Sequence, residues 1–358
     1  MSQNKKSGIY FLIAAISFVV PFFVAWKAVE TRPAPRPVPA PDVSGVDQGI
    51  WDYLLKTYVK DGLVNYNLLK KDYLFSVYLR QIGTCNPDAL QTDDQKLALY
   101  CNAYNALVIN GVIKNKITDS VNDFSISAEV AARTAEEFKR EAEEKEAKKQ
   151  RELAGLPEPK VEKEEEEEKT EFFDIRDHIF AGKTVSLNHI EHTLIRPVFN
   201  DPRVHVALVC AARSCPAIRG EAYTGDAIQT QLQEQSALFA NSSQHVQYDA
   251  ASNKLMLSAI LSWYGGDWTA KYPGQYVTWT NKNLDPPKDE QREAGYVQWI
   301  DSLTQDPNLK PHLADALSGK IKVGFKKYDW KLNSQAEPKK RDPNKAKGGG
   351  FGSGSVPE

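Results

Sequence analysis

The sequence predicts an α+β fold, a single helix-dominated domain with a small mixed or antiparallel sheet. From Ile50 to Ile117 apolar residues recur at the three- and four-residue steps of core-facing helices. The continuous apolar run Val204 to Cys210 is typical of a buried central strand. Alternating segments beside turn residues indicate short hairpins. Because helical stretches surround the strands, both kinds of element are expected to share one core.

An uncharged segment near the N-terminus predicts a membrane anchor. Residues 9–26 carry no charged side chain, and about 18 apolar residues can cross the hydrocarbon layer as a helix. We expect residues 1–8 to be cytoplasmic, residues 9–28 to span the membrane once, and the domain to lie on the extracytoplasmic side. A cleaved signal peptide is the alternative, but Trp26 stands where cleavage needs a small residue.

The composition of the chain then divides it into four further parts. Alternate prolines between Thr31 and Asp42 predict an extended spacer, so residues 29–46 are assigned as a linker. The globular domain is expected over 47–333, and a Pro-, Lys- and Gly-rich disordered tail over 334–358. Within the domain, residues 128–170 form a charged insertion without an apolar stripe. The insertion is expected to be a solvated, coiled-coil-like helix followed by disorder, and a partner-binding arm is the alternative.

The second half of the domain contains the predicted strands. The pair Gly182-Lys183 beside Val185 suggests a short hairpin. Asn188 is expected to begin a helix, with Glu191 completing a capping box and Pro197 ending it. The buried strand Val204 to Cys210 follows. A second hairpin is expected from Val246–Asp249 and Lys254–Leu257.

Charge and motif content exclude several functional classes. A formal net charge of −2 offers no basic face for nucleic acid. The chain has no Gly-rich phosphate loop and no serine nucleophile elbow. Cys210 and Cys215 with scattered histidines lack the tight spacing of zinc ligands, so neither a metal nor another cofactor is expected.

Local clusters of polar and aromatic residues resemble a known family when taken together and in order. They are Tyr100-Cys-Asn-Ala-Tyr-Asn-Ala-Leu, Ile190-Glu-His, Asp201-Pro-Arg-Val-His-Val-Ala-Leu-Val-Cys, Ser214-Cys-Pro and Lys327-Tyr-Asp-Trp-Lys-Leu-Asn. This set resembles domain-of-unknown-function family 547, over roughly Trp51 to Asn333. The resemblance implies a fold and a motif set but no agreed activity.

Cys215 is the candidate nucleophile of the chain. It follows the predicted strand in a loop, where Arg213 is expected to favour its thiolate. His205 and His192 are the candidate bases. The candidate groups that orient the base or donate to an oxyanion are Asn102, Asn105 and Glu191. Tyr104, Asn105, Arg203 and Arg213 are expected to contribute to binding. By analogy alone, the set is loosely papain- or transglutaminase-like.

Each candidate also has a structural interpretation. Cys215 could form a disulfide with Cys210 or simply pack, and Cys210 itself is expected in the core. His205 could be a bonded core histidine, and Glu191 a helix cap. Arg203 is expected to pair with Asp201 or Glu191. Two hypotheses therefore stay open: a membrane-anchored, thiol-dependent hydrolase or acyl transferase, and a non-catalytic ligand- or protein-binding scaffold.

Overall fold

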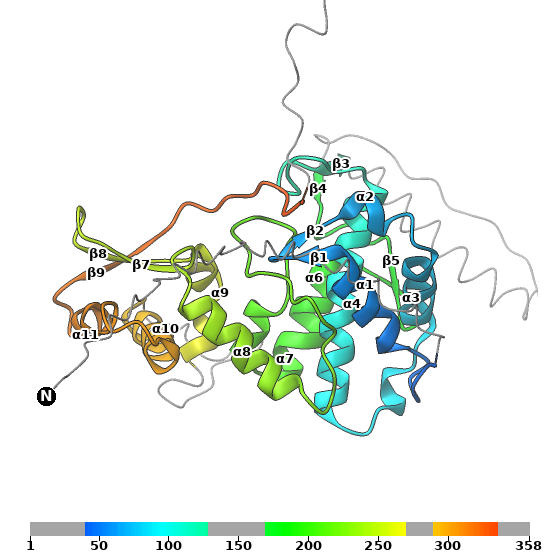
Figure 1. Ribbon diagram of the computed structural model, residues 1–358, viewed down its shortest axis with the longest axis horizontal. Helices are drawn as coiled ribbons and strands as arrows, with labels where there is room; N and C mark the ends of the chain where they lie inside the picture. The colour runs from blue at the N-terminus through cyan, green and yellow to red at the C-terminus, as the bar shows by residue number, and fades with distance from the viewer. Residues whose placement is uncertain (1–39, 128–168, 270–288, 336–358) are drawn as a thin grey trace, which may run out of the picture. The chain divides into compact units, whose positions relative to one another are not determined.

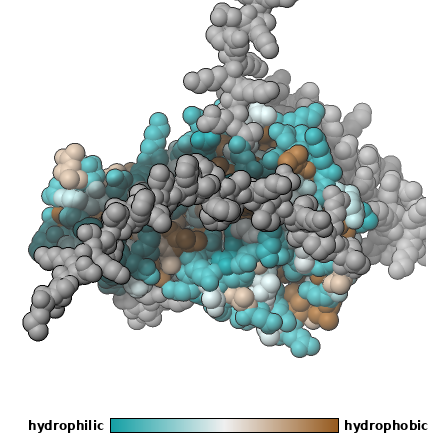
Figure 2. Space-filling model, viewed as in Figure 1, coloured by the Kyte–Doolittle hydropathy of each residue, from teal (hydrophilic) through white to brown (hydrophobic). Residues whose placement is uncertain are grey.

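A computed structural model describes residues 40–127, 169–269 and 289–335 (Figure 1). The predicted anchor (9–28), most of the linker, most of the charged insertion and nearly all of the tail lie outside these residues. In the described ranges, no helix combines the length and the apolar character needed to cross a bilayer. The predicted α+β class is confirmed: helices dominate, and the sheets have two or three strands. The face shown in Figure 2 is mainly hydrophilic.

Side-chain caps begin the helices of the N-terminal half. Helix α1 (Gln48–Tyr58) starts at Asp47, and α3 (Tyr73–Thr84) starts at Asp72. Helix α4 (Asp93–Lys114) starts with a complete capping box between Thr92 and Gln95. Between them lie β1 (Val59–Lys60), β2 (Leu63–Val64), α2 (Tyr66–Leu69) and the 3-10 turn η1 (Pro87–Ala89).

Helix α4 is the centre of the larger core. Its predicted apolar stripe is confirmed, and burial extends around the whole helix from Leu97 to Ile109, apart from Tyr100. The helices α1 and α3 pack in the same apolar cluster, where the rings of Trp51 and Tyr78 stack 5.2 Å apart. Asn102 and Asn105 are therefore completely enclosed, at 0% and 3% exposure.

Both predicted hairpins are confirmed. Strand β5 (His178–Phe180) pairs antiparallel with β6 (Lys183–Val185) across a turn at Gly182, whose φ of 74° suits glycine. Strand β7 (Val246–Asp249) pairs antiparallel with β8 (Lys254–Leu257). The sequence did not predict β9 (Lys322–Phe325), which adds to β8 in parallel. The ends of the charged insertion also meet, because β3 (Ser125–Ser127) pairs with β4 (Lys169–Glu171).

The predicted central strand Val204 to Cys210 is wrong. Residues Pro202–Val206 form the 3-10 helix η3, which Pro202 and the capping carboxylate of Asp201 begin. The run is buried as expected, but Asn105 satisfies its backbone in place of a neighbouring strand. The Asn105 side chain donates to Ala207 O at 2.9 Å and accepts from Val209 N–H at 3.0 Å. An apolar run predicts that a segment is buried, but it does not predict its backbone conformation. Here the buried Asn105 amide satisfies the backbone groups that a neighbouring strand would otherwise have to satisfy.

The helix that precedes η3 also differs from its prediction. Ser186, not Asn188, caps α6 (Leu187–His189), and the chain stays helical through the π-helix η2 (Ile190–Ile195) and α7 (Arg196–Phe199). Pro197 therefore lies inside the helical segment, in the first turn of α7, where its missing N–H is tolerated. The helix ends instead at Asn200, which has a left-handed φ of 50°. Because Glu191 is not a cap residue, its carboxylate is available to other partners.

A second apolar cluster forms beside the three-stranded sheet. It includes residues of α8 (Ile228–Ala240), α9 (Ala259–Thr269), α10 (Asp289–Leu303) and α11 (Lys310–Leu317), with Trp268 and Trp299 at its centre. His245 lies against this cluster and stacks on Phe239, with ring centroids 4.3 Å apart. Its Nδ1 has no hydrogen-bond partner among the residues that the structure describes, and burial lowers its pKa to about 4.

Replacing His245 by phenylalanine is expected to reduce acid sensitivity. Between pH 6.5 and 4 the unfolded chain binds a proton at this residue that the folded protein does not. The contribution of His245 to the free energy of unfolding therefore falls by about 2 to 3 kcal/mol as the pH falls through that window. Urea unfolding at pH 7 and pH 4.5 measures the loss for both proteins. An equal loss in the wild type and in His245→Phe would contradict the assignment. His178, whose pKa burial also lowers to about 4, should keep part of the effect in the variant.

Candidate functional site

A cavity of about 280 Å³ lies where α4, η2, η3 and α9 approach the C-terminal segment. Its wall contains both cysteines of the Cys210–Cys215 pair together with Glu191 and His205. The other lining residues are Tyr104, Val121, Asn122, Glu171, Phe172, Phe173, Asn188, Leu208, Ile260, Trp263, Tyr264, Tyr328 and Trp330. Apolar walls with a few convergent polar groups are typical of small-molecule sites.

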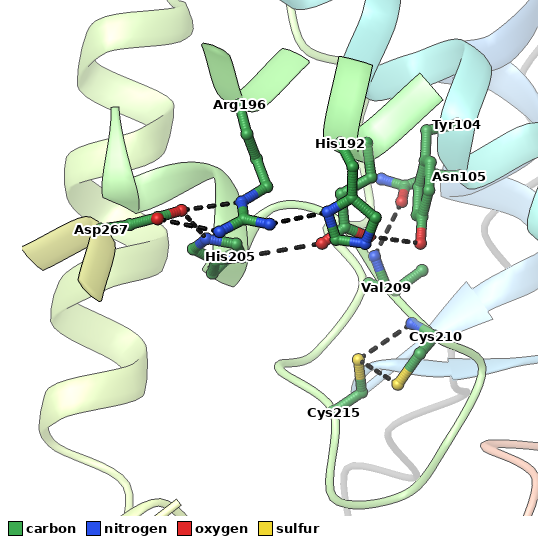
Figure 3. Close-up of polar contacts among 10 residues, drawn as sticks. Tyr104, Asn105, His192, Arg196, His205, Val209, Cys210, Cys215 and Asp267 are labelled. Atoms are coloured by element: carbon green, nitrogen blue, oxygen red, sulfur yellow. Dashed lines mark hydrogen bonds and ion pairs between the residues drawn. The ribbon is translucent and has the colours of Figure 1, made fainter. Parts of the chain in front are cut away.

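Cys210 and Cys215 are not joined by a disulfide, and their sulfur atoms are in contact. Their Sγ atoms lie 3.0 Å apart, and the Cys210 N–H donates to Cys215 Sγ at 3.0 Å (Figure 3). The hydroxyl of Tyr328 lies 2.9 Å from Cys210 Sγ. Ala211, directly after Cys210, has a left-handed φ of 59°, which is costly for a residue with a Cβ. The backbone between the two cysteines is thus held in a strained conformation.

The C-terminal segment holds this conformation in place. The N–H of Arg213 donates to Lys331 O at 2.8 Å, and the N–H of Asn333 donates to Ala211 O at 2.9 Å. Ser214 N–H donates to Asp329 O at 3.1 Å. These bonds fix the cysteine loop from the outside and bring Tyr328 to the sulfur atoms. The Tyr-Asp-Trp motif is therefore part of the site.

The acidity of the pair differs from the prediction. Burial raises the pKa of Cys215, which is only 5% exposed. The pKa of Cys210 is lowered despite burial, because Cys210 contacts Cys215 and the Tyr328 hydroxyl. The expectation that Arg213 favours a Cys215 thiolate is wrong, because the Arg213 side chain is exposed and desolvation dominates at Cys215. Cys210, expected in the core, is half-buried and lines the cavity. The directions of the two pKa shifts favour the thiolate on Cys210.

A chain of polar contacts begins at the cavity residues Glu191 and His205. His205 Nε2 lies 2.7 Å from Asp267 Oδ2, and His205 Nδ1 lies 3.9 Å from Glu191 Oε1. Tyr104 donates its hydroxyl to Glu191 Oε2 at 3.0 Å. Arg196 donates to both oxygens of Asp267, at 2.8 and 2.9 Å. Burial acts to raise the pKa of Asp267, but the bonds from His205 and Arg196 outweigh it and hold the pKa below its usual range.

The ring of Tyr264 packs against this chain of groups. It stacks on His205 with centroids 4.1 Å apart, and the Arg196 guanidinium lies 5.0 Å from its centroid. Burial and the charge of Glu191 raise the pKa of Tyr264, so its hydroxyl stays protonated. His192 is not among the cavity residues. Its Nδ1 lies 2.7 Å from Arg196, and burial lowers its pKa.

The remaining predicted site residues hold the surrounding loops. Asn102 donates to Tyr223 O at 2.8 Å and accepts from Tyr223 N–H at 3.0 Å, just as Asn105 does for Ala207 and Val209. Arg203 pairs with Asp201, as expected, with Nε 2.9 Å from Oδ1. The Arg213 backbone joins the cysteine loop to its neighbours. These groups shape the site without entering the cavity.

The cysteine pair and the histidines form separate sets of contacts, as Figure 3 shows. Within the described parts of the chain, no hydrogen bond or ion pair joins Cys210 or Cys215 to His205 or His192. The described parts of the chain also contain no group of three His, Cys, Asp or Glu side chains placed to hold a metal ion.

Sequence reasoning missed several residues of the site. Asp267 and Tyr264 lie in the segment Trp263-Tyr-Gly-Gly-Asp-Trp, whose dense aromatic content was the available signal. Tyr328 and Trp330 belong to a motif that supported the family resemblance but received no role. Arg196 lies four residues after His192 in the same helical segment, a spacing that places both side chains on one face.

Comparison with known proteins confirms the family resemblance. Residues 87–240 match the family model described as "Protein of unknown function, DUF547". The matched segment contains both cysteines, Glu191 and His205, and it ends before Asp267 and Tyr328. No curated protein and no solved structure matches the chain.

Proposed function

We propose that this chain is a thiol-dependent hydrolase or acyl transferase whose nucleophile is the Cys210–Cys215 pair. The observation that carries the proposal is the shared cavity: both cysteines line the same space as Glu191 and His205. Cys215 was the nucleophile expected from the sequence. The lowered pKa of Cys210 and the raised pKa of Cys215 support Cys210 as the attacking atom.

The cavity brings together a thiol pair and a carboxylate, which can take two roles in acyl transfer. The Cys210 thiolate attacks a carbonyl carbon, so a C–S bond forms while the bond to the leaving group breaks. The leaving group takes its electron pair and the proton held by Cys215. Water or another acceptor then attacks the thioester, and the Glu191 carboxylate accepts its proton and returns it to the cysteine pair. Asp267 fixes the His205 ring, whose Nδ1 lies 3.9 Å from Glu191 Oε1.

We further propose that residues 9–28 anchor the chain and present the domain on the extracytoplasmic side. The uncharged run of spanning length and the poor cleavage site support this arrangement. The chain should then stay with the membrane fraction after alkaline extraction. Release of the protein into the supernatant would count against an anchor.

Selective alkylation tests the nucleophile. At pH 7 iodoacetamide should modify Cys210 first, because a thiolate is the reactive form. Cys85 and Cys101 are internal controls: both are buried, and burial raises the pKa of each thiol, to about 11 for Cys85. Intact-mass and peptide analysis should show at least a tenfold faster reaction at Cys210 than at either control.

Two serine variants separate the roles of the pair. Cys210→Ser should abolish the rapid alkylation and any turnover of a panel of 4-nitrophenyl esters. Cys215→Ser should retain a reactive Cys210 but slow its reaction at neutral pH, since the sulfur that stabilises the thiolate is lost. Equally slow alkylation of all four cysteines in the native protein would contradict the proposal.

A non-catalytic binding module remains the second candidate. The lack of any described contact between the sulfur atoms and His205 favours it, because a thiol nucleophile usually has a base in hydrogen-bond reach. This function predicts that small molecules bind in the cavity of the native protein and of Cys210→Ser alike, with no ester turnover by either. Turnover that depends on Cys210 would exclude it.

A further inference from the structure

The cavity wall carries negative charge. Its charged lining residues are Glu191, which is 6% exposed, and Glu171, which is exposed, with His205 beside them. Of the described residues that line the cavity, none is lysine or arginine. Arg196, the cation beside this group, makes two bonds to Asp267, so its charge is already balanced. A buried carboxylate in a cavity lined by no described lysine or arginine favours a positively charged ligand.

Aromatic rings complete the same wall. Three rings form a cluster, those of Trp263, Tyr328 and Trp330. The ring centroid of Trp263 lies 4.8 Å from that of Tyr328 and 5.7 Å from that of Trp330, and the Tyr328 and Trp330 centroids are 4.6 Å apart. Trp263 is 47% exposed, which is unusual for tryptophan unless the ring serves a surface contact. Electron-rich ring faces attract cations, and aromatic cages with nearby carboxylates recognise quaternary ammonium groups.

We infer that the cavity binds an organic cation, a ligand with a quaternary or primary ammonium group. The ammonium group contacts the Trp263 ring cluster and is neutralised by Glu191. An anionic ligand would meet repulsion from both glutamates, and a purely apolar ligand would cover the Glu191 carboxylate without offering it a positive charge. This inference rests on the proposed function, for which it defines the substrate class: a carbonyl compound that also carries an ammonium group.

A matched pair of probes tests the charge requirement. Choline and 3,3-dimethylbutan-1-ol have nearly the same shape, and only choline is charged. Titration of the full chain in detergent, followed by tryptophan fluorescence and by calorimetry, should show choline binding at least tenfold more tightly than the alcohol. Equal affinity for the two probes, or no binding of choline at millimolar concentration, would overturn the inference.

Substitutions then locate the site. Glu191→Gln should weaken choline binding at least tenfold and leave the neutral alcohol unaffected. Trp263→Leu should weaken choline binding several-fold and reduce the fluorescence change. Because Trp263 is half-exposed, the variant is expected to fold. Glu234→Gln is the matched control, because Glu234 lies outside the cavity and is exposed. Undiminished choline binding by Glu191→Gln and Trp263→Leu would place the cation elsewhere and refute the assignment.

Cys210→Ser separates this inference from the proposed function. If choline binds Cys210→Ser as it binds the native protein while native Cys210 shows no selective reactivity, the cation site stands and the thiol enzyme does not. If Cys210 reacts selectively but choline fails to bind, the enzyme proposal stands and the cation site is rejected.

Discussion

Replacing Asp267 by alanine is expected to lower the free energy of unfolding by about 3 to 5 kcal/mol. The Asp267 carboxylate accepts two bonds from Arg196 and lies 2.7 Å from His205 Nε2, and the His205 side chain is only 2% exposed. Without it, a largely buried guanidinium and a buried imidazole lose their partner at the same time. The cost comes from the uncompensated Arg196 charge more than from the loss of any single bond.

Urea unfolding of three variants measures this effect. Asp267→Asn keeps an acceptor but removes the charge, so its loss should be smaller than that of Asp267→Ala. Asp301→Ala is the control, since Asp301 forms a surface ion pair with Lys310 and is 41% exposed; its loss should stay within about 1 kcal/mol. A loss below about 1 kcal/mol in Asp267→Ala would show that the buried network contributes little.

Replacing Asn105 by leucine should destabilise the protein by about 2 to 5 kcal/mol. The Asn105 amide satisfies the buried carbonyl of Ala207 and the buried N–H of Val209, and each unsatisfied group costs about 1 to 3 kcal/mol. Leucine has a similar size, so packing contributes little to the loss. Because Val209 adjoins Cys210, the same change should loosen the cysteine loop.

The Asn105→Leu variant needs both a stability and a reactivity measurement. Thermal unfolding should show a melting temperature lowered by several degrees, and alkylation of Cys215, normally buried, should become faster. Asn110→Leu on the same helix is the control, because Asn110 is half-buried and a change there is expected to be small. If Asn105→Leu and Asn110→Leu unfold alike, the loop does not depend on the amide.

Several features followed from the sequence because their causes are local. The apolar period of α4, the hairpin β5–β6 around Gly182 and the hairpin β7–β8 each depend on residues that are neighbours in the chain. The motifs around Cys210, Cys215, His205 and Glu191 likewise indicated the family, which the match over residues 87–240 confirms. Residue type and spacing alone were enough for these conclusions.

Other features depended on partners distant in the chain. The run Val204 to Cys210 forms a 3-10 helix and a loop because Asn105, about 100 positions earlier, satisfies its backbone. Tyr328, which helps to lower the pKa of Cys210, lies 118 positions from it, and the position of His205 depends on Asp267. No local pattern encodes these contacts, since burial and charge pairing are set only when the segments pack together. The sequence by itself determined the α+β class, the helix of residues 93–114, both hairpins and the family resemblance. Only the tertiary structure decided which side chains share the cavity of the two cysteines, because they come from segments distant in the chain.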